Sequence, residues 1–369
     1  MAGSSHRLDA VIIGGGFAGA ATAWWLKHHG VERIKVLEQE DMPGIHASGR
    51  NAGIARQGVP EPPTSLLAAL GTSFLRHPPP GFCPTPLLEP TGGFLLSTVA
   101  DDPRLDEIQR NAMAAGVHTY PASRSEVLDK VPSLMESPFR SALACPHDGL
   151  VDIHALLTSY LAPVEVETSA KVTGFHVDKH KVTAVETSKG TLHADWVVNA
   201  AGAWAGEVAR LADASPLAIT PRRRHLLHTG PLDGAGAPAP YVWCLHPAVY
   251  FRTERRGLLL SPCDEATWKP GSPPADPDAP AWLSERLSTT FPHLANLPIA
   301  RMWAGLRSFS DDGNFVIGRD PKVSNFLWVA GLGGHGMTTS AAVGELAAAL
   351  LLGRVPPLDP APYSPARFK

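Results

Sequence analysis

Three glycines near the start of the chain have the spacing of a phosphate-binding turn. Gly14, Gly16 and Gly19 follow the GxGxxG pattern, in which the first glycine makes a tight turn, the second admits a pyrophosphate and the third lets a helix pack on a strand. Glu38 follows about 20 residues later, where a carboxylate can accept a hydrogen bond from a ribose hydroxyl. An acid here disfavours the 2′-phosphate of NADP. The spacing therefore predicts an adenine dinucleotide, either FAD or NAD.

An arginine within an apolar stretch is a candidate for binding a substrate carboxylate. Arg307 is flanked by Trp303, Leu306 and Phe309, and a guanidinium buried there without a partner would be costly. Its planar fork can pair with both oxygens of a carboxylate at once. We therefore expect Arg307 to anchor an anionic ligand rather than to lie on a solvated face.

The glycine triplet lies between a predicted strand and a predicted helix. The apolar run 10–13 predicts the strand, and apolar residues at helical spacing predict a helix over 18–29, with Gly30 as its C-terminal stop. The amides that open this helix, near Phe17, would face the phosphates of the ligand. A strand before the turn, a helix after it and an acid at the right distance strengthen the prediction of a dinucleotide site.

The same order of strand, small-residue turn and helix returns twice further along the chain. One strand ends at 197–199 and leads to a helix that reaches about Leu211. Another, at 326–330, leads through a glycine-rich turn at 331–336 into a helix over 337–352. Three strand ends that are distant in the sequence can therefore converge on one ligand.

Composition and charge argue against several classes of protein. The net charge is −3 and no basic run stands out, so we do not expect a nucleic-acid partner. The four cysteines are widely separated, which suggests neither a metal site nor a dithiol centre and favours a reducing cytoplasm. The stretch 1–8 is too short and polar for a signal peptide. The apolar stretch 341–352, at about 12 residues, is too short to span a bilayer, so we expect no integral membrane segment.

Five motifs occur in one order along nearly the whole chain: the opening glycines, 44–53, 197–204, 303–309 and 333–337. Together they resemble the FAD-dependent D-amino-acid oxidase and glycine oxidase superfamily. Within it, the chain is most similar to the bacterial D-arginine dehydrogenase type, which also has a Pro-Pro-x-Gly-Phe-Cys stretch like 78–83. The resemblance implies FAD bound in an extended form, and an amino or imino acid oxidised at its Cα.

The resemblance also implies an α/β fold with two interleaved domains. Strand-like stretches at 248–251 and 257–260 fit a second lobe inserted into the first. The predicted parts are a Rossmann-like, glutathione-reductase-like FAD-binding domain (1–75, 146–212 and 305–369) and an α+β substrate-binding domain on a mostly antiparallel sheet (76–145 and 213–304).

Cofactor contacts are assigned by the resemblance to the three turns and to the loop after the second strand. His46 matches a histidine of noncovalent relatives, so we expect noncovalent FAD. The amides opening the helix at Gly336 and Met337 would point at the flavin N1 and C2 carbonyl. The predicted cofactor-binding residues are Gly14, Gly16, Phe17, Ala18, Gly19, Glu38, Gln39, Ser48, Gly49, Arg50, Asn51, Ala52, Gly53, Val172, Ala200, Gly202, Trp204, Arg307, Gly333, Gly334, His335, Gly336 and Met337.

Four residues are predicted to act on the substrate. Arg224 and Arg307 stand where the superfamily anchors the substrate carboxylate, and Tyr250 matches a tyrosine over the substrate. His335 replaces a tyrosine of the D-arginine dehydrogenase type and could donate to a carboxylate. A structural role stays open for Arg224, whose neighbours are also basic, and for His335.

The expected reaction is hydride transfer from Cα to flavin N5, giving an imino acid that hydrolyses to a 2-keto acid and ammonia or an amine. Gly93 stands where the D-arginine dehydrogenase type has the acid that receives a guanidinium, and Ile54 and about Gly58 replace a histidine and a tyrosine. We therefore expect a D-amino acid with a neutral or apolar side chain, or a small secondary amine such as proline. Dioxygen, or a quinone or other electron carrier, would reoxidise the flavin.

Two other functions stay open. A flavin-dependent 2-hydroxy-acid dehydrogenase of the same superfamily would need a base for the hydroxyl proton, for which His335 is the candidate. A non-catalytic FAD-binding subunit would need no substrate at all. A pyridine-nucleotide disulfide reductase is not favoured, because the four cysteines include no closely spaced pair that could act as a redox centre.

Overall fold

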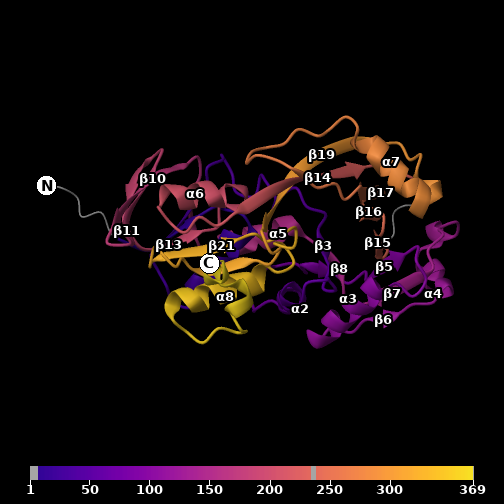
Figure 1. The fold of residues 1–369 in the computed structure, drawn as a ribbon, viewed down its shortest axis with the longest axis horizontal. Helices are drawn as coiled ribbons and strands as arrows, with labels where there is room; N and C mark the ends of the chain where they lie inside the picture. Colours follow the sequence, from indigo (N-terminus) through magenta and orange to yellow (C-terminus); the bar gives the residue numbers. More distant parts are fainter. Residues whose placement is uncertain (1–6, 234–237, 369) are drawn as a thin grey trace.

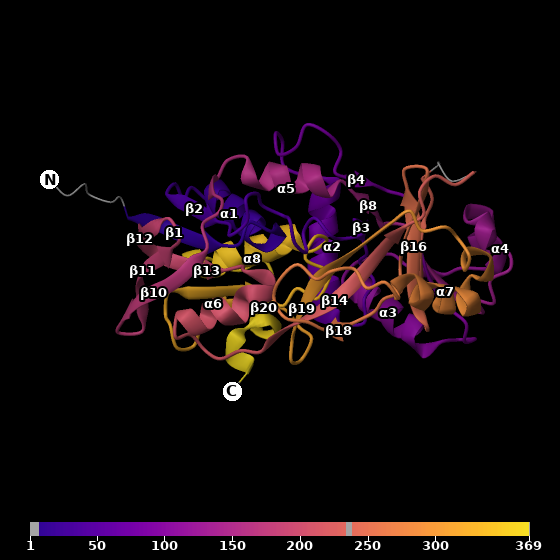
Figure 2. The same ribbon diagram turned by 90° about the horizontal axis from the view of Figure 1, so that it is seen from above.

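The computed structural model describes residues 7–233 and 238–368, so most of the polar N-terminal stretch 1–8 lies outside the described residues. Two large sheets occupy opposite ends of an elongated molecule (Figures 1 and 2). One is a six-stranded, mostly parallel sheet and the other a nine-stranded, mostly antiparallel sheet. This architecture agrees with the predicted α/β fold class.

The six-stranded sheet is a central layer that is buried on both faces. Alternate residues of β1 face opposite sides. Ala10 and Ile12 pack towards helices α1 (Phe17–His28) and α8 (Ser340–Leu352), while Val11 and Ile13 pack towards helix α6 and a three-stranded sheet. The strand order is β20 (Val316–Arg319), β21 (Phe326–Ala330), β13 (Ala194–Asn199), β1 (Leu8–Ile13), β2 (Ile34–Leu37) and β9 (Glu165–Glu167), and the covering elements are α6 (Ala205–Leu211), β10 (Val172–Asp178), β11 (Lys181–Thr187) and β12 (Gly190–Leu192).

The nine-stranded sheet has one face covered by helices, and part of its other face is turned towards the first sheet. In β16, Val249 and Phe251 pack into a cluster with α4 and α7, whereas Tyr250 between them faces the opposite side and packs near Ala52. The strands are β5 (Gly93–Ser97), β6 (Tyr120–Pro121), β7 (Ser141–Cys145), β14 (Ile219–His228), β15 (Tyr241–Leu245), β16 (Ala248–Glu254), β17 (Gly257–Ser261), β18 (Ala266–Thr267) and β19 (Arg301–Ser310); the helices are α3 (Pro103–Ala114), α4 (Arg124–Lys130) and α7 (Ala279–Thr290).

Two long strands join the two ends of the molecule. β14 and β19 pair antiparallel along their full length, from Ile219 opposite Ser310 to His228 opposite Arg301, and Figure 1 shows them running between the two sheets. The predicted domain boundary between 304 and 305 falls inside β19. The division into two domains stays a prediction.

The remaining elements connect the two regions. Three short strands form a small sheet next to the loop 44–53. Two further helices pack against α1 and α8. These elements are β3 (Ile54–Ala55), β4 (Leu88–Glu89), β8 (Gly149–Val151), α2 (Pro62–Arg76) and α5 (Ile153–Leu161), with short 3-10 helices at Pro132–Leu134, Gly202–Trp204, Pro292–Leu294, Ala361–Tyr363 and Pro365–Arg367.

Most of the predicted elements are present, and one boundary is wrong. The first helix, predicted over 18–29, spans Phe17–His28, and Gly30 just beyond it has a left-handed φ of 87°. The strands predicted at 248–251 and 257–260 lie within β16 and β17. The helix predicted over 337–352 begins only at Ser340. All four cysteines are free. None of the described helices combines the length and apolar character needed to cross a membrane.

The contact between α1 and α8 gives the first testable prediction. A Cβ placed on Gly344 would lie 2.6 Å from the Ala21 carbonyl carbon, so Gly344→Ala forces the two helices apart. We expect a loss of about 1–3 kcal/mol of stability, measured as a lower melting temperature. Gly206→Ala in α6 is the matched control, because its Cβ would meet nothing within 4 Å. Equal melting temperatures for the two variants would contradict the proposed role of this contact.

Candidate active site

A cavity of about 750 Å³ is lined by residues from both large sheets. The carboxyl ends of β1, β13 and β21 open into it, as expected for a ligand site on a parallel sheet. From the other side, β14, β15, β16 and β19 contribute side chains. All of the predicted site residues line this cavity except Gly19 and Gly49. The structure thus brings together residues that are about as far apart in the sequence as Gly14 and Met337.

The phosphate turn fits a ligand that approaches the backbone closely. Gly14 has a left-handed φ of 108°, and a Cβ on Gly19 would lie 2.0 Å from the Gly14 carbonyl oxygen. Gly19 therefore packs the helix against the turn and need not face the cavity. A Cβ on Gly16 would lie 2.8 Å from Oγ of Ser48, which accepts a hydrogen bond from the Phe17 amide at 3.0 Å. The helix opening and the Ser48 loop thus form one wall.

Glu38 is held in place by two backbone amides. Its carboxylate accepts hydrogen bonds from the Gly15 and Glu40 amides, both at 3.0 Å. Only 8% of the residue is exposed. Each carboxylate oxygen keeps a lone pair for a further donor, which fits the predicted contact with a ribose hydroxyl.

Some side chains of the loop 44–53 hold the loop itself. The Asn51 amide donates to the Ser48 carbonyl at 2.6 Å and accepts from the Gly53 amide at 2.8 Å, so both of its ends are engaged within the loop. Arg50 donates to the Ala304 carbonyl at 3.1 Å. His46 lies 2.8 Å from a Glu40 oxygen. That contact gives the His46 ring a partner within the protein.

The second glycine-rich segment differs from the prediction in a way that matters for the cofactor. Residues 333–339 form turns, and α8 begins after Thr339. The Thr338 hydroxyl donates to the carbonyl of Ile54, which is distant in the sequence. The Thr339 hydroxyl donates to the His335 carbonyl four residues earlier, a local side-chain bond of the kind that competes with helix formation. In the described part of the chain, the amides of Gly336 and Met337 have no partner. Free amides at the cavity wall fit the polar edge of a flavin, without a helix end.

Arg307 lies in the cavity with no carboxylate beside it. Burial lowers its pKa first, and the neighbouring Arg224 lowers it further, while Tyr250 and Cys263 act in the other direction. No acid is among these groups. The Tyr250 side chain is fully buried, its hydroxyl forms no hydrogen bond with any described residue, and its ring stacks on Trp243 at 4.3 Å. Arg307 and Tyr250 therefore present unused polar groups to a ligand.

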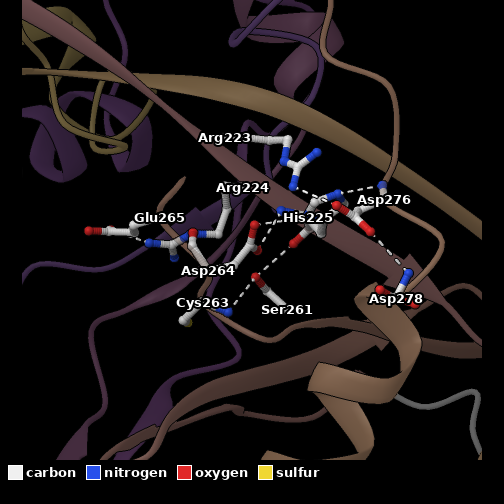
Figure 3. Close-up of polar contacts among 9 residues, drawn as sticks. All are labelled: Arg223, Arg224, His225, Ser261, Cys263, Asp264, Glu265, Asp276 and Asp278. Atoms are coloured by element: carbon white, nitrogen blue, oxygen red, sulfur yellow. Dashed lines mark hydrogen bonds and ion pairs between the residues drawn. The ribbon is translucent and has the colours of Figure 1, made fainter. Parts of the chain in front are cut away.

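Arg224, by contrast, already has partners. Its guanidinium donates to the Asp264 carbonyl at 2.7 Å and pairs with the Glu265 carboxylate. Figure 3 shows Arg224 pointing towards Glu265, with His225 on the neighbouring position held by Asp264 and Asp276. Arg224 lines the cavity, but its charge is balanced inside the protein.

His335 is neutral in this environment. Burial lowers its pKa well below the usual value, and the positive charges of Arg56, Arg307 and Arg224 lower it further. The ring is therefore an imidazole that can donate or accept a hydrogen bond but that resists protonation. This property matters for the choice between an amine and a hydroxyl substrate.

Sequence reasoning missed several residues of the cavity, among them two with aromatic or charged side chains near Tyr250, and misplaced one. Arg56 and Trp243 line the cavity, with the Arg56 guanidinium 4.1 Å from the centre of the Trp243 ring. The alternation of β15 could have indicated Trp243; a lone charge beside the buried Ala55 was the only signal for Arg56. Gly93 is not a lining residue, because a Cβ there would lie 2.1 Å from the Tyr241 ring. No side chain at 93 could reach the substrate past that ring.

A buried acid lies behind Arg56. Asp148 accepts hydrogen bonds from the Tyr241 hydroxyl at 2.6 Å and from the Gln57 side chain at 2.9 Å. Burial raises its pKa to about 6, while these hydrogen bonds and the charge of Arg56 oppose the rise. Asp148 thus fixes Gln57, the residue next to Arg56 in the chain.

Comparison with known proteins identifies the family. The family described as FAD dependent oxidoreductase (DAO) matches residues 9–350. The chain belongs to this family. FAD-dependent oxidoreductase domain-containing protein 1 of Bos taurus is 26% identical, covering 98% of this chain and 85% of its own length. Glycine oxidase of Pseudomonas aeruginosa is 26% identical, covering 96% and 98%. The crystal structure of L-proline dehydrogenase from P. horikoshii superposes with a TM-score of 0.88 at 25% identity, covering 98% of each chain.

These matches confirm the predicted superfamily, fold class and cofactor: the protein is an FAD-dependent oxidoreductase of the DAO family. The roles of the individual site residues, the substrate and the electron acceptor stay predictions. So does the cytoplasmic location. Among the described residues, no group of three or more His, Cys, Asp or Glu side chains is placed to hold a metal ion.

Asp148 gives a prediction for the dependence of stability on pH. Because its folded pKa of about 6 lies above the ordinary 3.8, the folded state favours the protonated acid. Its contribution is therefore fully present below pH 3.8 and is lost as the pH rises through 6. Asp148→Asn keeps the shape without the charge. We expect the melting temperature of this variant minus that of the wild type to increase between about pH 4 and pH 6 and then to level off. A difference that stays constant over this range would contradict the raised pKa.

Proposed function

We propose that the protein oxidises an amino or imino acid at its Cα. The carrying observation is the guanidinium of Arg307 at the cavity wall, which lies next to the buried hydroxyl of Tyr250 and has no acid beside it among the described residues. A ligand carboxylate would supply the missing acceptor. The neighbours named glycine oxidase and L-proline dehydrogenase support this class of substrate.

The chain's own residues would hold the cofactor along the cavity. We expect Gly14, Gly16 and the Ser48 hydroxyl, which accepts from the Phe17 amide, to contact the diphosphate. We expect Glu38 to contact the ribose, and the amides of Gly336 and Met337 to contact the flavin. When bound, FAD supplies the two-electron acceptor for the Cα hydrogen, and the imino product hydrolyses to a 2-keto acid with release of ammonia or an amine. The cofactor would be noncovalent.

A D-amino acid or a small secondary amine stays the proposed form of the substrate. The test is anaerobic bleaching of the flavin by D-, L- and N-methyl amino acids and by 2-hydroxy acids, with purified FAD-loaded protein. We expect bleaching by amines and none by hydroxy acids. Bleaching by no compound at all would favour a non-catalytic FAD-binding subunit instead. Comparing peroxide release with dye reduction then distinguishes dioxygen from a quinone or other carrier.

The environment of His335 argues against a hydroxy acid as substrate. Abstraction of a hydroxyl proton needs a base that accepts a proton readily, whereas burial, and then the charges of three guanidinium groups, lower the pKa of His335 well below its usual value. We therefore expect His335→Ala to retain flavin reduction by an amino acid with a modest loss of rate. Near-complete loss of reduction would favour the hydroxy-acid alternative.

Arg307 gives a prediction that separates charge from geometry. Arg307→Lys keeps the positive charge but loses the planar fork. We expect kcat/KM for the substrate to fall by about tenfold to a hundredfold, the equivalent of one charge-assisted hydrogen bond, mainly through KM. FAD content and melting temperature serve as controls for folding. An unchanged kcat/KM would show that Arg307 does not bind the substrate.

A second variant tests the position of the Arg307 side chain by changing Gly334, the residue that packs against it. Gly334 has a left-handed φ of 92°, and a Cβ there would lie 2.9 Å from Cδ of Arg307. Gly334→Ala would therefore displace the arginine without removing it. We expect a higher KM for this variant than for the wild type, measured by steady-state kinetics. The same KM in both proteins would contradict the positioning role of Gly334.

A further inference from the structure

We propose that Arg56 binds a second carboxylate, so that the substrate is an amino or imino acid carrying two acidic groups. This inference rests on the proposed function and specifies its substrate class. It replaces the sequence-based expectation of a neutral or apolar side chain. Three observations support it. The Nε of Arg56 has no hydrogen-bond partner among the described residues, the acids nearby pair with other groups, and Arg56 lines the cavity beside Trp243.

The Arg56 guanidinium packs on an aromatic ring. It lies 4.1 Å from the centre of the Trp243 ring, close enough for a cation–π contact. Its Nε is buried and has no partner among the residues 7–233 and 238–368, and a buried donor without a partner costs free energy. The guanidinium of an arginine offers further donors in the same plane, so a guanidinium at the cavity wall is suited to an incoming planar anion.

The acids near Arg56 are engaged elsewhere. Asp148 is the acid whose pKa Arg56 influences, but its carboxylate accepts hydrogen bonds from Tyr241 and Gln57. Glu265, the acid that lines the cavity beside Arg224, pairs with both Arg224 and Arg222. Asp148 can balance part of the Arg56 charge through space, but it leaves the donors of the fork free for a ligand.

Arg56 and Arg307 form two separate anchors around one pair of rings. Arg56 lies against Trp243, Trp243 stacks on Tyr250 at 4.3 Å, and Tyr250 lies beside Arg307. Both guanidinium groups and the His335 ring line the same cavity, and the charges of both arginines lower the pKa of His335. One carboxylate satisfies one planar fork. A second carboxylate on the same molecule satisfies the other.

The test compares ligands that differ by one carboxylate. Anaerobic flavin reduction of the FAD-loaded wild type is titrated with alanine against aspartate, and with 2-aminobutyrate against glutamate, in both configurations. We expect the acidic member of a pair to bind about tenfold tighter or more, as one charge-assisted pair provides. Arg56→Gln should bring the ratio close to one, and Arg56→Lys should give an intermediate value. Reduction by amino acids with no preference for the acidic member would overturn the inference while leaving the proposed function intact.

A second measurement does not depend on turnover or on a variant. The melting temperature of the FAD-loaded wild type is followed with succinate and with propionate, since a ligand that binds the folded state raises it. We expect a larger rise with succinate. Equal rises in melting temperature with the two acids would overturn the proposal for Arg56. This result does not depend on turnover, whereas failure of every amino acid to reduce the flavin would overturn the proposed function.

Arg301→Gln is the matched control. Arg301 also lies over a tryptophan, with its guanidinium 5.4 Å from the Trp303 ring, but it is exposed at the start of β19 and does not line the cavity. We expect this variant to keep the wild-type ratio of acidic to neutral ligand. Loss of the ratio in Arg301→Gln as well as in Arg56→Gln would show a general effect of charge, and would overturn the assignment to Arg56.

Discussion

Guanidinium groups that line the cavity with no acid paired to them, among the described residues, are the constraint around which this end of the molecule is organised. Arg56 and Arg307 both line the cavity, Arg56 with a buried Nε that has no partner and Arg307 with no acid beside it. The surroundings limit the cost without neutralising either group. Glu265 balances Arg224, Trp243 offers its ring face to Arg56, and His335 stays uncharged. A bound anion would offset the free-energy cost of these unpaired guanidinium groups.

Strand geometry places these groups. In β16, alternation sends Val249 and Phe251 into the core under α4 and α7 and leaves Tyr250 on the opposite face. The register of β14 with β19 sets Arg222 opposite Arg307, a repulsive cross-strand pair. Arg222 relieves it by pairing with Glu265. The strand register therefore places an arginine, and not an acid, opposite Arg307. Glu265, in the loop before β18, pairs with Arg222 and Arg224 instead.

The cofactor end could be predicted from the sequence because its signals are local. Gly14, Gly16, Gly19 and Glu38 lie within one strand, turn, helix and strand, and backbone geometry fixes their functions. The substrate end depends on contacts between distant segments. Arg56 could be recognised as a site residue only from its contact with Trp243, which lies far away in the sequence on β15. Gly93 does not line the cavity as expected, because the Tyr241 ring packs against it. The start of α8 was misjudged because the Thr338 and Thr339 hydroxyls bond to backbone carbonyls, one of them in a distant strand.

The same positive field bears on the reaction itself. An amine gives up its Cα hydrogen as hydride when its nitrogen is unprotonated, since the lone pair then forms the imine. The three guanidinium groups that add to the effect of burial in lowering the pKa of His335 would act in the same sense on any ammonium bound beside them, because a nearby positive charge disfavours the charged form of a base. Loss of the substrate proton to solvent is thus favoured on binding, and no protein base is required. A hydroxyl substrate gains less from this field, because its ordinary pKa lies much further above neutrality. The charges that we propose to anchor a carboxylate would therefore also favour an amine as the reacting group.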